Sequence, residues 1–242
     1  MRKDLRPYWL KKLYMTYRRW YTDYFLRPQC EYLGPWDAVS KPWYVHISGP
    51  NIRIGKCLTA IGEPMHRVEI GVWGREDGHG RIEIGDDALL SPGTRISASD
   101  EIVIGNAVMM ANGTYITDSD WHTVYDRTQR DSEAKPVHIG DNVWLGDGCC
   151  ILKGVTIGDN SIVAARAVVT HDIPANVIVA GNPAKVVREL DSERGFRTRT
   201  DYFADPAGLE RFFDQVDKDV LVGNSFFRWL LSIIYPKSLK WK

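Results

Sequence analysis

Aliphatic residues recur every six positions through the middle of the chain. In the segment IGDNVWLGDGCCILKGVTIGDNSIV they fall at Ile139, Leu145, Ile151, Ile157 and Val163. A helix would repeat every 3.6 residues and a half-buried strand every two, so neither explains this spacing. Glycine and Asp or Asn follow the aliphatic positions, as expected where each short strand ends in a tight turn. Three such hexads, the 18 residues from Ile139 to Ile157, are predicted to close one coil of a parallel β-helix.

The same period extends towards the N-terminus with interruptions. Four pairs of aliphatic residues lie beside a glycine: Ile52 and Ile54, Val68 and Ile70, Ile82 and Ile84, and Ile102 and Ile104. The later hexads run, with one slip of two residues after the third position, through Ile84, Leu90, Ile96, Ile104, Met110 and Ile116. A Gly-rich, charged excursion at residues 73–81 separates the early coils. Terminal solenoid repeats are usually irregular, so we predict one β-helix over residues 44–190.

A long polar insertion interrupts the regular hexads at residues 117–138, with the sequence TDSDWHTVYDRTQRDSEAKPVH. A solenoid can extrude a loop at a turn without disturbing its neighbouring coils, and such loops tend to line a binding face. The loop contains His122, preceded by Asp118 and Asp120. We therefore look for chemistry in this loop.

Both ends of the chain are predicted to be helical. Residues 5–27 place Leu10, Leu13, Tyr17, Trp20 and Tyr24 on one helix face and charged residues on the other. This helix could pack on the β-helix or on another subunit, or it could lie on a membrane surface.

A second helix is predicted after the repeats. Asp205 can cap it, Pro206 suits its first position and Gly223 can close it. The last segment, residues 226–242, is apolar and then basic, and it is too short to span a bilayer. The predicted organisation is an N-terminal region (1–43), the β-helix (44–190) and a helical extension (191–242).

Charge adds a reason to consider a membrane surface. The total net charge is zero, yet residues 1–28 carry eight basic and two acidic side chains, and residues 226–242 carry four basic and no acidic ones. With these ends at +6 and +4, the rest of the chain carries −10. No secretory signal and no spanning run is recognisable, so a cytoplasmic protein is expected, with peripheral contact to the inner face of the membrane as a hypothesis.

The cysteines have no CxxC spacing, and neither a metal site nor a nucleic-acid partner is predicted.

Over about residues 82–190 the sequence resembles the hexapeptide-repeat acyltransferases, in particular the galactoside, maltose and nodulation-factor O-acetyltransferases. The resemblance rests on IGDNVWLGDG, on GVTIGDNSIVAARAVVTHDIPANVIVAGNPAKVVREL and on the loop histidine. It implies an all-β fold, a left-handed parallel β-helix, here with α-helical N- and C-terminal extensions. It also implies a homotrimer with active sites between subunits and acetyl-CoA as co-substrate.

The resemblance assigns roles to individual residues. The family's catalytic histidine matches His122. The positions that contact coenzyme A match Trp144, Asp147, Ala165, Thr170, His171, Lys185 and Arg188. Around the histidine, Asp118, Asp120, Trp121 and Tyr125 offer hydrogen bonds and an aromatic face that suit a sugar. The residues that hold the sugar in galactoside-type members have no clear equivalents in SPGTRISAS, so a different acceptor is expected.

These residue types suit transfer of an acetyl group from acetyl-CoA to a hydroxyl of a sugar or lipid-linked saccharide. A neutral imidazole is the side chain best matched to removing the hydroxyl proton near neutral pH. Two other functions stay open at this point. A non-catalytic trimeric scaffold would use the same β-helix, and a γ-type carbonic anhydrase would need a second histidine where this chain has Thr117.

Overall fold

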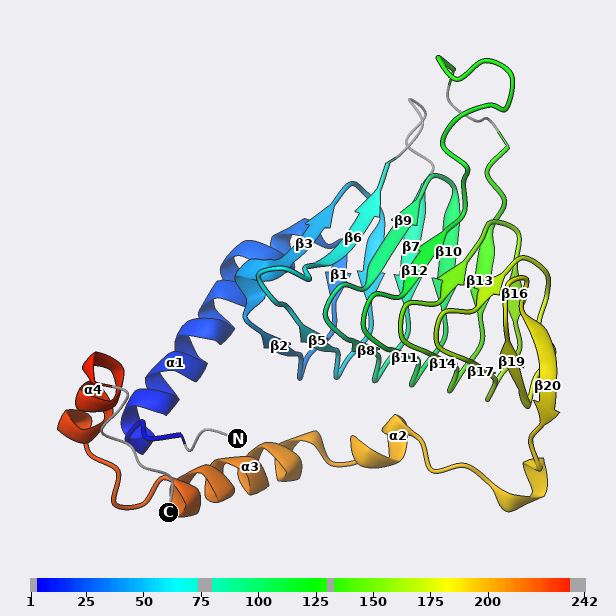
Figure 1. Cartoon of the computed structure of the whole chain (residues 1–242). Coiled ribbons are helices and arrows are strands. Elements are labelled where there is room, and N and C mark those ends of the chain that lie inside the picture. The colour runs from blue at the N-terminus through cyan, green and yellow to red at the C-terminus, as the bar shows by residue number, and fades with distance from the viewer. Residues whose placement is uncertain (1–3, 74–79, 130–132, 236–242) are drawn as a thin grey trace. The chain divides into compact units, whose positions relative to one another are not determined.

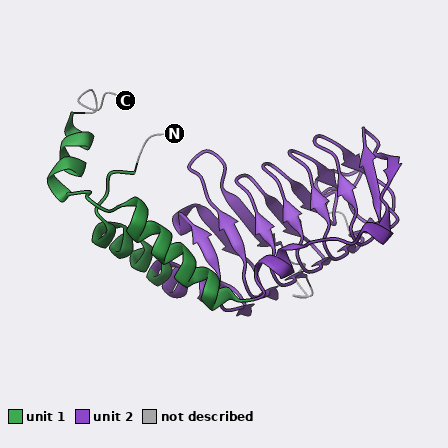
Figure 2. Ribbon diagram, turned by 90° about the horizontal axis from the view of Figure 1, so that it is seen from below, with its two compact units in different colours: residues 1–20, 205–242 green, residues 21–204 purple. Residues whose placement is uncertain are grey.

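The computed structural model describes residues 4–73, 80–129 and 133–235 (Figure 1). They form two compact units, shown in different colours in Figure 2. One comprises residues 21–204, and we call it the coil unit. The other comprises residues 1–20 with 205–242, and we call it the helical unit.

The coil unit contains three sheets whose strands follow one another in turn along the chain. Sheet A consists of β1 (Tyr32–Leu33), β4 (Ile52–Ile54), β7 (Arg81–Ile84), β10 (Glu101–Ile104), β13 (Val137–Ile139) and β16 (Thr156–Ile157). Sheet B consists of β2 (Ala38–Ser40), β5 (Thr59–Ile61), β8 (Leu89–Leu90), β11 (Met109–Met110), β14 (Trp144–Leu145), β17 (Ile162–Val163), β19 (Val177–Ala180) and β20 (Lys185–Glu189). Sheet C consists of β3 (Val45–Ser48), β6 (Val68–Val72), β9 (Arg95–Ala98), β12 (Tyr115–Thr117), β15 (Cys150–Ile151) and β18 (Val168–Val169). Each coil therefore contributes one strand to each sheet and has three corners, at which the chain passes from A to B, from B to C and from C to A.

The strand register confirms the coil predicted from the six-residue period. Ile139 pairs with Ile157, 18 residues further on, and Leu145 pairs with Val163 at the same offset. Between Ile84 and its partner Ile104 the offset is 20, which is the slip of two residues seen in the sequence. The strand pairs are parallel except β19 with β20, which is antiparallel. The described strands thus form a parallel β-helix.

The repeating aliphatic residues form its core. They stack in columns along the coils, with at most 3% of each side chain exposed: Ile54, Ile84, Ile104, Ile139 and Ile157 on sheet A, Leu90, Met110, Leu145 and Val163 on sheet B, and Ile70, Ile96, Ile116, Ile151 and Val169 on sheet C. Burying such a side chain stabilises the fold by about 1.5–3 kcal/mol. The columns explain why a period of six persists along so much of the sequence.

The glycine and Asx positions of each repeat stack in the same way at the A-to-B corner. The backbone N–H of Asp141 donates to Oδ1 of Asp159 at 2.8 Å, and that of Asn106 donates to Oδ1 of Asp141 at 2.6 Å. A Cβ on Gly140 would lie 2.2 Å from Oδ1 of Asp159. Gly140 is therefore required by the close approach of the next coil. Asn142, with φ of 55°, is the residue that adopts the left-handed turn conformation.

Short helices complete the coil unit. They are η1 (Thr22–Leu26), η2 (Arg27–Gln29), η3 (Pro42–Tyr44), η4 (Ser192–Arg194) and α2 (Arg199–Tyr202). After β20 the chain returns to the earlier coils, where Arg199 donates to the carbonyl of Asp87 at 2.6 Å and to Oγ1 of Thr59 at 2.8 Å. The carboxylate of Asp87 is also buried, and its charge attracts the guanidinium.

The helical unit joins both ends of the chain through α1 (Tyr8–Tyr21), α3 (Pro206–Val220) and α4 (Phe226–Ile234). The predicted N-terminal cap is present: Asp205 accepts from the N–H of Gly208 at 2.8 Å, and Pro206 opens α3. At the other end α3 stops at Val220, with Leu221 and not Gly223 as its C-cap. All-β therefore describes the coil unit alone, because these helices form a separate unit. The predicted excursion at residues 73–81 and the basic tail lie partly outside the described residues, at 74–79 and 236–242.

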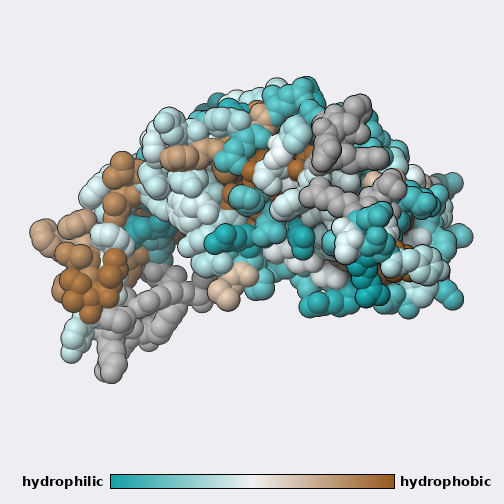
Figure 3. All heavy atoms as spheres, turned by 90° about the horizontal axis from the view of Figure 1, so that it is seen from above, coloured by the Kyte–Doolittle hydropathy of each residue, from teal (hydrophilic) through white to brown (hydrophobic). Residues whose placement is uncertain are grey.

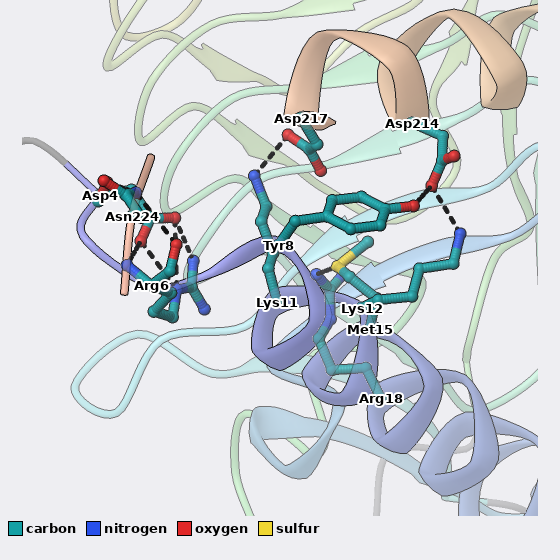
Figure 4. A network of polar contacts seen from close by, with 10 residues as sticks. All are labelled: Asp4, Arg6, Tyr8, Lys11, Lys12, Met15, Arg18, Asp214, Asp217 and Asn224. Carbon is teal, nitrogen blue, oxygen red and sulfur yellow. Dashed lines mark hydrogen bonds and ion pairs between the residues drawn. The ribbon is translucent and has the colours of Figure 1, made fainter. Parts of the chain in front are cut away.

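Ion pairs join α1 to α3 (Figure 4). Lys12 lies 2.6 Å from Asp214, Lys11 contacts Asp217, and Arg19 lies 3.1 Å from Glu210. The basic face of α1, for which the sequence suggests contact with anionic lipid, therefore forms ion pairs with acidic residues of the same chain. Contact with a membrane stays a prediction.

Apolar side chains of this unit remain exposed, and hydrophobic surface is visible in Figure 3. Among them are Trp9, Leu13, Phe212, Phe227 and Ile234, each more than half exposed. Among the described helices, none combines the length and apolar character needed to cross a bilayer.

Candidate functional site

The polar insertion leaves the coils after β12 and rejoins them at β13, at the C-to-A corner (Figure 1). Asp118, with 0% of its surface exposed, fixes its entry. The carboxylate accepts the backbone N–H groups of Ser99 and Asp100, each at 2.7 Å. The backbone carbonyl of Asp118 accepts the N–H of Lys135 at 2.9 Å, and this hydrogen bond joins the two limbs of the loop.

The environment of Asp118 has opposing effects on its ionisation. Burial raises the pKa of the carboxyl, and the backbone N–H donors act in the other direction. The carboxylate is fully buried and its partners are backbone groups, so its contact with an acceptor stays a prediction. In this structure Asp118 therefore anchors the loop.

Lys153, in the turn of the next coil at the same corner, forms a second attachment. Its Nζ lies 2.7 Å from Oδ2 of Asp120 and 3.2 Å from the carbonyl oxygen of Glu133. Asp120 belongs to the entering limb and Glu133 to the leaving limb. Sequence reasoning missed Lys153, whose only signal is that CCILKGV occupies the coil after the insertion.

The residues around His122 differ in exposure. Trp121 has φ of 66°, its N–H donates to Oγ of Ser119 at 3.0 Å, and its indole Nε1 is buried without a hydrogen-bond partner among the described residues. His122 is exposed, and the side chain of Tyr125 is fully exposed. The imidazole is therefore accessible on a loop whose base is attached to the coils.

The predicted coenzyme A residues lie in four places. Trp144 is 47% exposed on the outer face of β14. Asp147 and Ala165 follow at the B-to-C corner, where Asp147 lies 4.0 Å from Arg166. Thr170 and His171 follow β18 at the C-to-A corner, with Oγ1 of Thr170 at 2.8 Å from Nδ1 of His171. Lys185 and Arg188 are exposed on β20 at the end of sheet B.

These positions divide the site between corners. His122, Thr170 and His171 belong to the C-to-A corner, whereas Asp147 and Ala165 belong to the B-to-C corner, with sheet C between them. One chain therefore does not gather all the predicted residues at a single corner.

Burial sets the protonation state of two cysteine thiols of the coil unit. Burial raises the pKa of Cys57 to about 11 and that of Cys149 to about 12, so both thiols are protonated at neutral pH. Within the described residues, no group of three or more His, Cys, Asp or Glu side chains is arranged to hold a metal ion.

The repeat resembles a known family of transferases. Residues 136–171 match the family model for the bacterial transferase hexapeptide (six repeats). The chain is 40% identical over 122 residues to a putative acetyltransferase of Saccharomyces cerevisiae, covering 50% of this chain and 61% of the yeast protein. It is 39% identical over 126 residues to galactoside O-acetyltransferase of Escherichia coli, covering 51% of this chain and 50% of that enzyme. The chain thus spans less than two thirds of each of these relatives.

Acetyltransferases are also among the solved structures to which the chain is similar. A hexapeptide-repeat acetyltransferase from Vibrio cholerae, complexed with acetyl coenzyme A, is 29% identical with a TM-score of 0.45, covering 68% of this chain and 74% of that one. A maltose O-acetyltransferase from Clostridium difficile is 28% identical with a TM-score of 0.44, covering 69% and 73%. From the repeat and the sequence matches, the chain carries the bacterial transferase hexapeptide and resembles the hexapeptide-repeat acyltransferases, as its sequence predicted.

Proposed function

We propose that the protein is an acyltransferase that moves an acetyl group from acetyl-CoA to a hydroxyl of a saccharide-containing acceptor. The observation that carries the proposal is the exposed His122 on an insertion attached to the coils, directly before the matched repeat. The acetyltransferase names of the relatives support the reaction class. The half-buried Trp121 and the exposed Tyr125 beside His122 support a sugar as acceptor.

His122 acts in this proposal as the general base. Its neutral imidazole takes the proton of the acceptor hydroxyl as the oxygen attacks the thioester carbon, and a positioned base contributes about 10² to 10⁴ in rate. The carbon–sulfur bond then breaks, the acetyl group remains on the acceptor oxygen, and the sulfur leaves with a proton returned by the imidazolium. No cysteine nucleophile is needed, which agrees with the raised pKa values of Cys57 and Cys149.

We further infer that the coil is left-handed and that three copies assemble, with His122 of one copy facing the coenzyme A residues of another. The separation of His122 from Asp147 and Ala165 by sheet C supports this sharing. Mixing and reassembling two inactive variants, His122→Ala and Asp147→Ala, would restore part of the activity if the site is shared, because some interfaces then contain both intact halves. Activity that sediments as a monomer would contradict it.

The acceptor can be found by a screen for release of free coenzyme A from acetyl-CoA over free sugars, nucleotide sugars and lipid-linked saccharides. A saccharide that gains an acetyl ester, identified by mass spectrometry, would support the proposal. Absence of a thermal shift with coenzyme A would favour the scaffold alternative, and zinc-dependent hydration of carbon dioxide would favour the carbonic anhydrase alternative.

A further inference from the structure

We propose that Lys153 is a positioning residue, which ties the two limbs of the insertion together and so sets the place of His122. The inference rests on the proposed function for the role of His122, but its structural part is independent of it. Neither the resemblance nor the sequence pattern assigns a role to Lys153.

The contacts of Lys153 reach both limbs of the insertion. On the entering limb its ammonium group lies 2.7 Å from the carboxylate of Asp120, and on the leaving limb it donates to the carbonyl of Glu133 at 3.2 Å. These limbs are thirteen residues apart in sequence, from position 120 to position 133, so one side chain closes the neck of the loop. Because Lys153 comes from the following coil, it fixes the neck to the body of the β-helix.

The turn that carries Lys153 is itself in contact with the leaving limb. The N–H of Gly154 donates to the carbonyl of Lys135 at 3.0 Å. Gly154 has φ of +75°, and a Cβ there would lie 3.3 Å from the Cβ of Lys135. Glycine thus lets the turn approach the loop closely.

The burial of Lys153 distinguishes it from an ordinary surface lysine. Its side chain is 20% exposed, compared with 60% for Asp120. A screened pair between two mobile side chains contributes little, whereas a lysine stem packed into the protein holds its charge in a defined place. Asp120 is the more exposed partner, and the ion pair with Lys153 restrains it.

The restraint acts close to the proposed base. Asp120 lies two positions before His122, and the intervening Trp121 is held by its own backbone hydrogen bond to Ser119. Beyond this point the loop closes on itself, with the N–H of Asp126 donating to Oγ1 of Thr123 at 3.1 Å. Since a displacement of about 1 Å at a reacting group can cost about 10² in rate, loosening Asp120 should reduce turnover.

The test compares wild type with Lys153→Met, which keeps the stem length but removes the charge, and with Lys153→Arg, which keeps the charge. Lys41→Met is the matched control, since Lys41 forms a 2.6 Å ion pair with Glu63 in the first coils. Amide hydrogen exchange of residues 118–129 reports the attachment of the loop without any need for activity. Transfer kinetics then report kcat and KM for acetyl-CoA separately.

We expect Lys153→Met to increase exchange in residues 118–129 and to lower kcat about ten-fold with an unchanged KM, with partial recovery in Lys153→Arg and no effect of Lys41→Met. Unchanged exchange in Lys153→Met would overturn the inference. A raised KM for acetyl-CoA with unchanged kcat would also overturn it, because Lys153 would then bind the co-substrate. If wild type transfers no acetyl group, the proposed function fails, while the exchange measurement still decides whether Lys153 holds the loop.

Discussion

Asp118 shows how one buried side chain can attach a functional loop. Its carboxylate receives two backbone N–H groups from the preceding coil and has no exposed surface. The sequence predicts that Asp118 lies near the base, but it cannot distinguish an anchor from an acceptor ligand. That distinction depends on how the coils stack, because stacking places the N–H groups of Ser99 and Asp100 against the carboxylate.

Asp118→Asn is predicted to destabilise the protein by about 1–3 kcal/mol. The side-chain oxygen of Asn can accept one of the two backbone N–H groups, but its NH2 group, a donor, would face the other N–H. Urea unfolding at neutral pH would measure the difference. Asp86→Asn is the control, since Asp86 accepts the N–H of Lys56 at an exposed turn and its neighbour on the next coil, Asn106, is already an asparagine. Equal effects of the two substitutions would contradict the anchoring role of Asp118.

At the scale of elements, the six-residue period predicted the strands and their register. Each aliphatic side chain points inward and stacks on the aliphatic side chain at the same position of the next coil. The same pattern could not explain the repeat glycines. The sequence assigns the turn conformation to the glycine and to the Asp or Asn behind it, and the structure shows it at Asn142. Gly140 is instead the point of close contact between coils. Only the stacked coils reveal that contact.

Gly140→Ala is therefore predicted to cost about 1–3 kcal/mol of stability, as overpacking usually does. The measurement is thermal or denaturant unfolding of the variant. Measured in an Asp159→Ala background, the added cost of Gly140→Ala should be smaller, because the nearest atom to the new Cβ is Oδ1 of Asp159. If Gly140→Ala alone were as stable as wild type, the coils could move apart there without loss of folding free energy, and the predicted role of Gly140 would be wrong.

The pairing of α1 with α3 is an element-scale feature that the sequence did not predict. Each amphipathic pattern is visible alone, but the ion pairs join residues about 200 positions apart, and no periodicity reports such a match. Hydrogen bonds from Lys12, Lys218 and Tyr8 lower the pKa of Asp214 below its ordinary value of 3.8. A carboxylate with a lowered folded pKa stabilises above pH 3.8, and this contribution is lost as the pH falls through the folded value.

Asp214→Asn is predicted to increase hydrogen exchange in α1 at neutral pH, with wild type and variant converging as the pH falls below about 4. High salt should reduce the difference, because the pairs are partly exposed. Asp219→Asn serves as control, since Asp219 accepts from Gln215 on its own helix and has no ion pair with α1 among the described residues. Equal exchange in wild type and Asp214→Asn at neutral pH would mean that other contacts hold α1.

At the scale of the whole molecule, the repeat predicted a coil unit but not a unit built from both ends of the chain. The candidate site shows the same limit. The sequence identified the insertion and His122, because a polar interruption of a regular repeat is conspicuous, yet it could not show that His122 and Asp147 lie at different corners. This separation makes assembly of several copies part of the proposed mechanism.

The central claim is that His122 is the base for acetyl transfer. It is tested most directly by measuring kcat of His122→Ala with acetyl-CoA and the acceptor found by the screen, alongside coenzyme A binding by calorimetry. His46→Ala, which removes another exposed histidine on β3, is the control. We predict a loss of about two orders of magnitude or more in kcat for His122→Ala, unchanged coenzyme A affinity, and wild-type activity for His46→Ala. Wild-type turnover by His122→Ala would contradict the account.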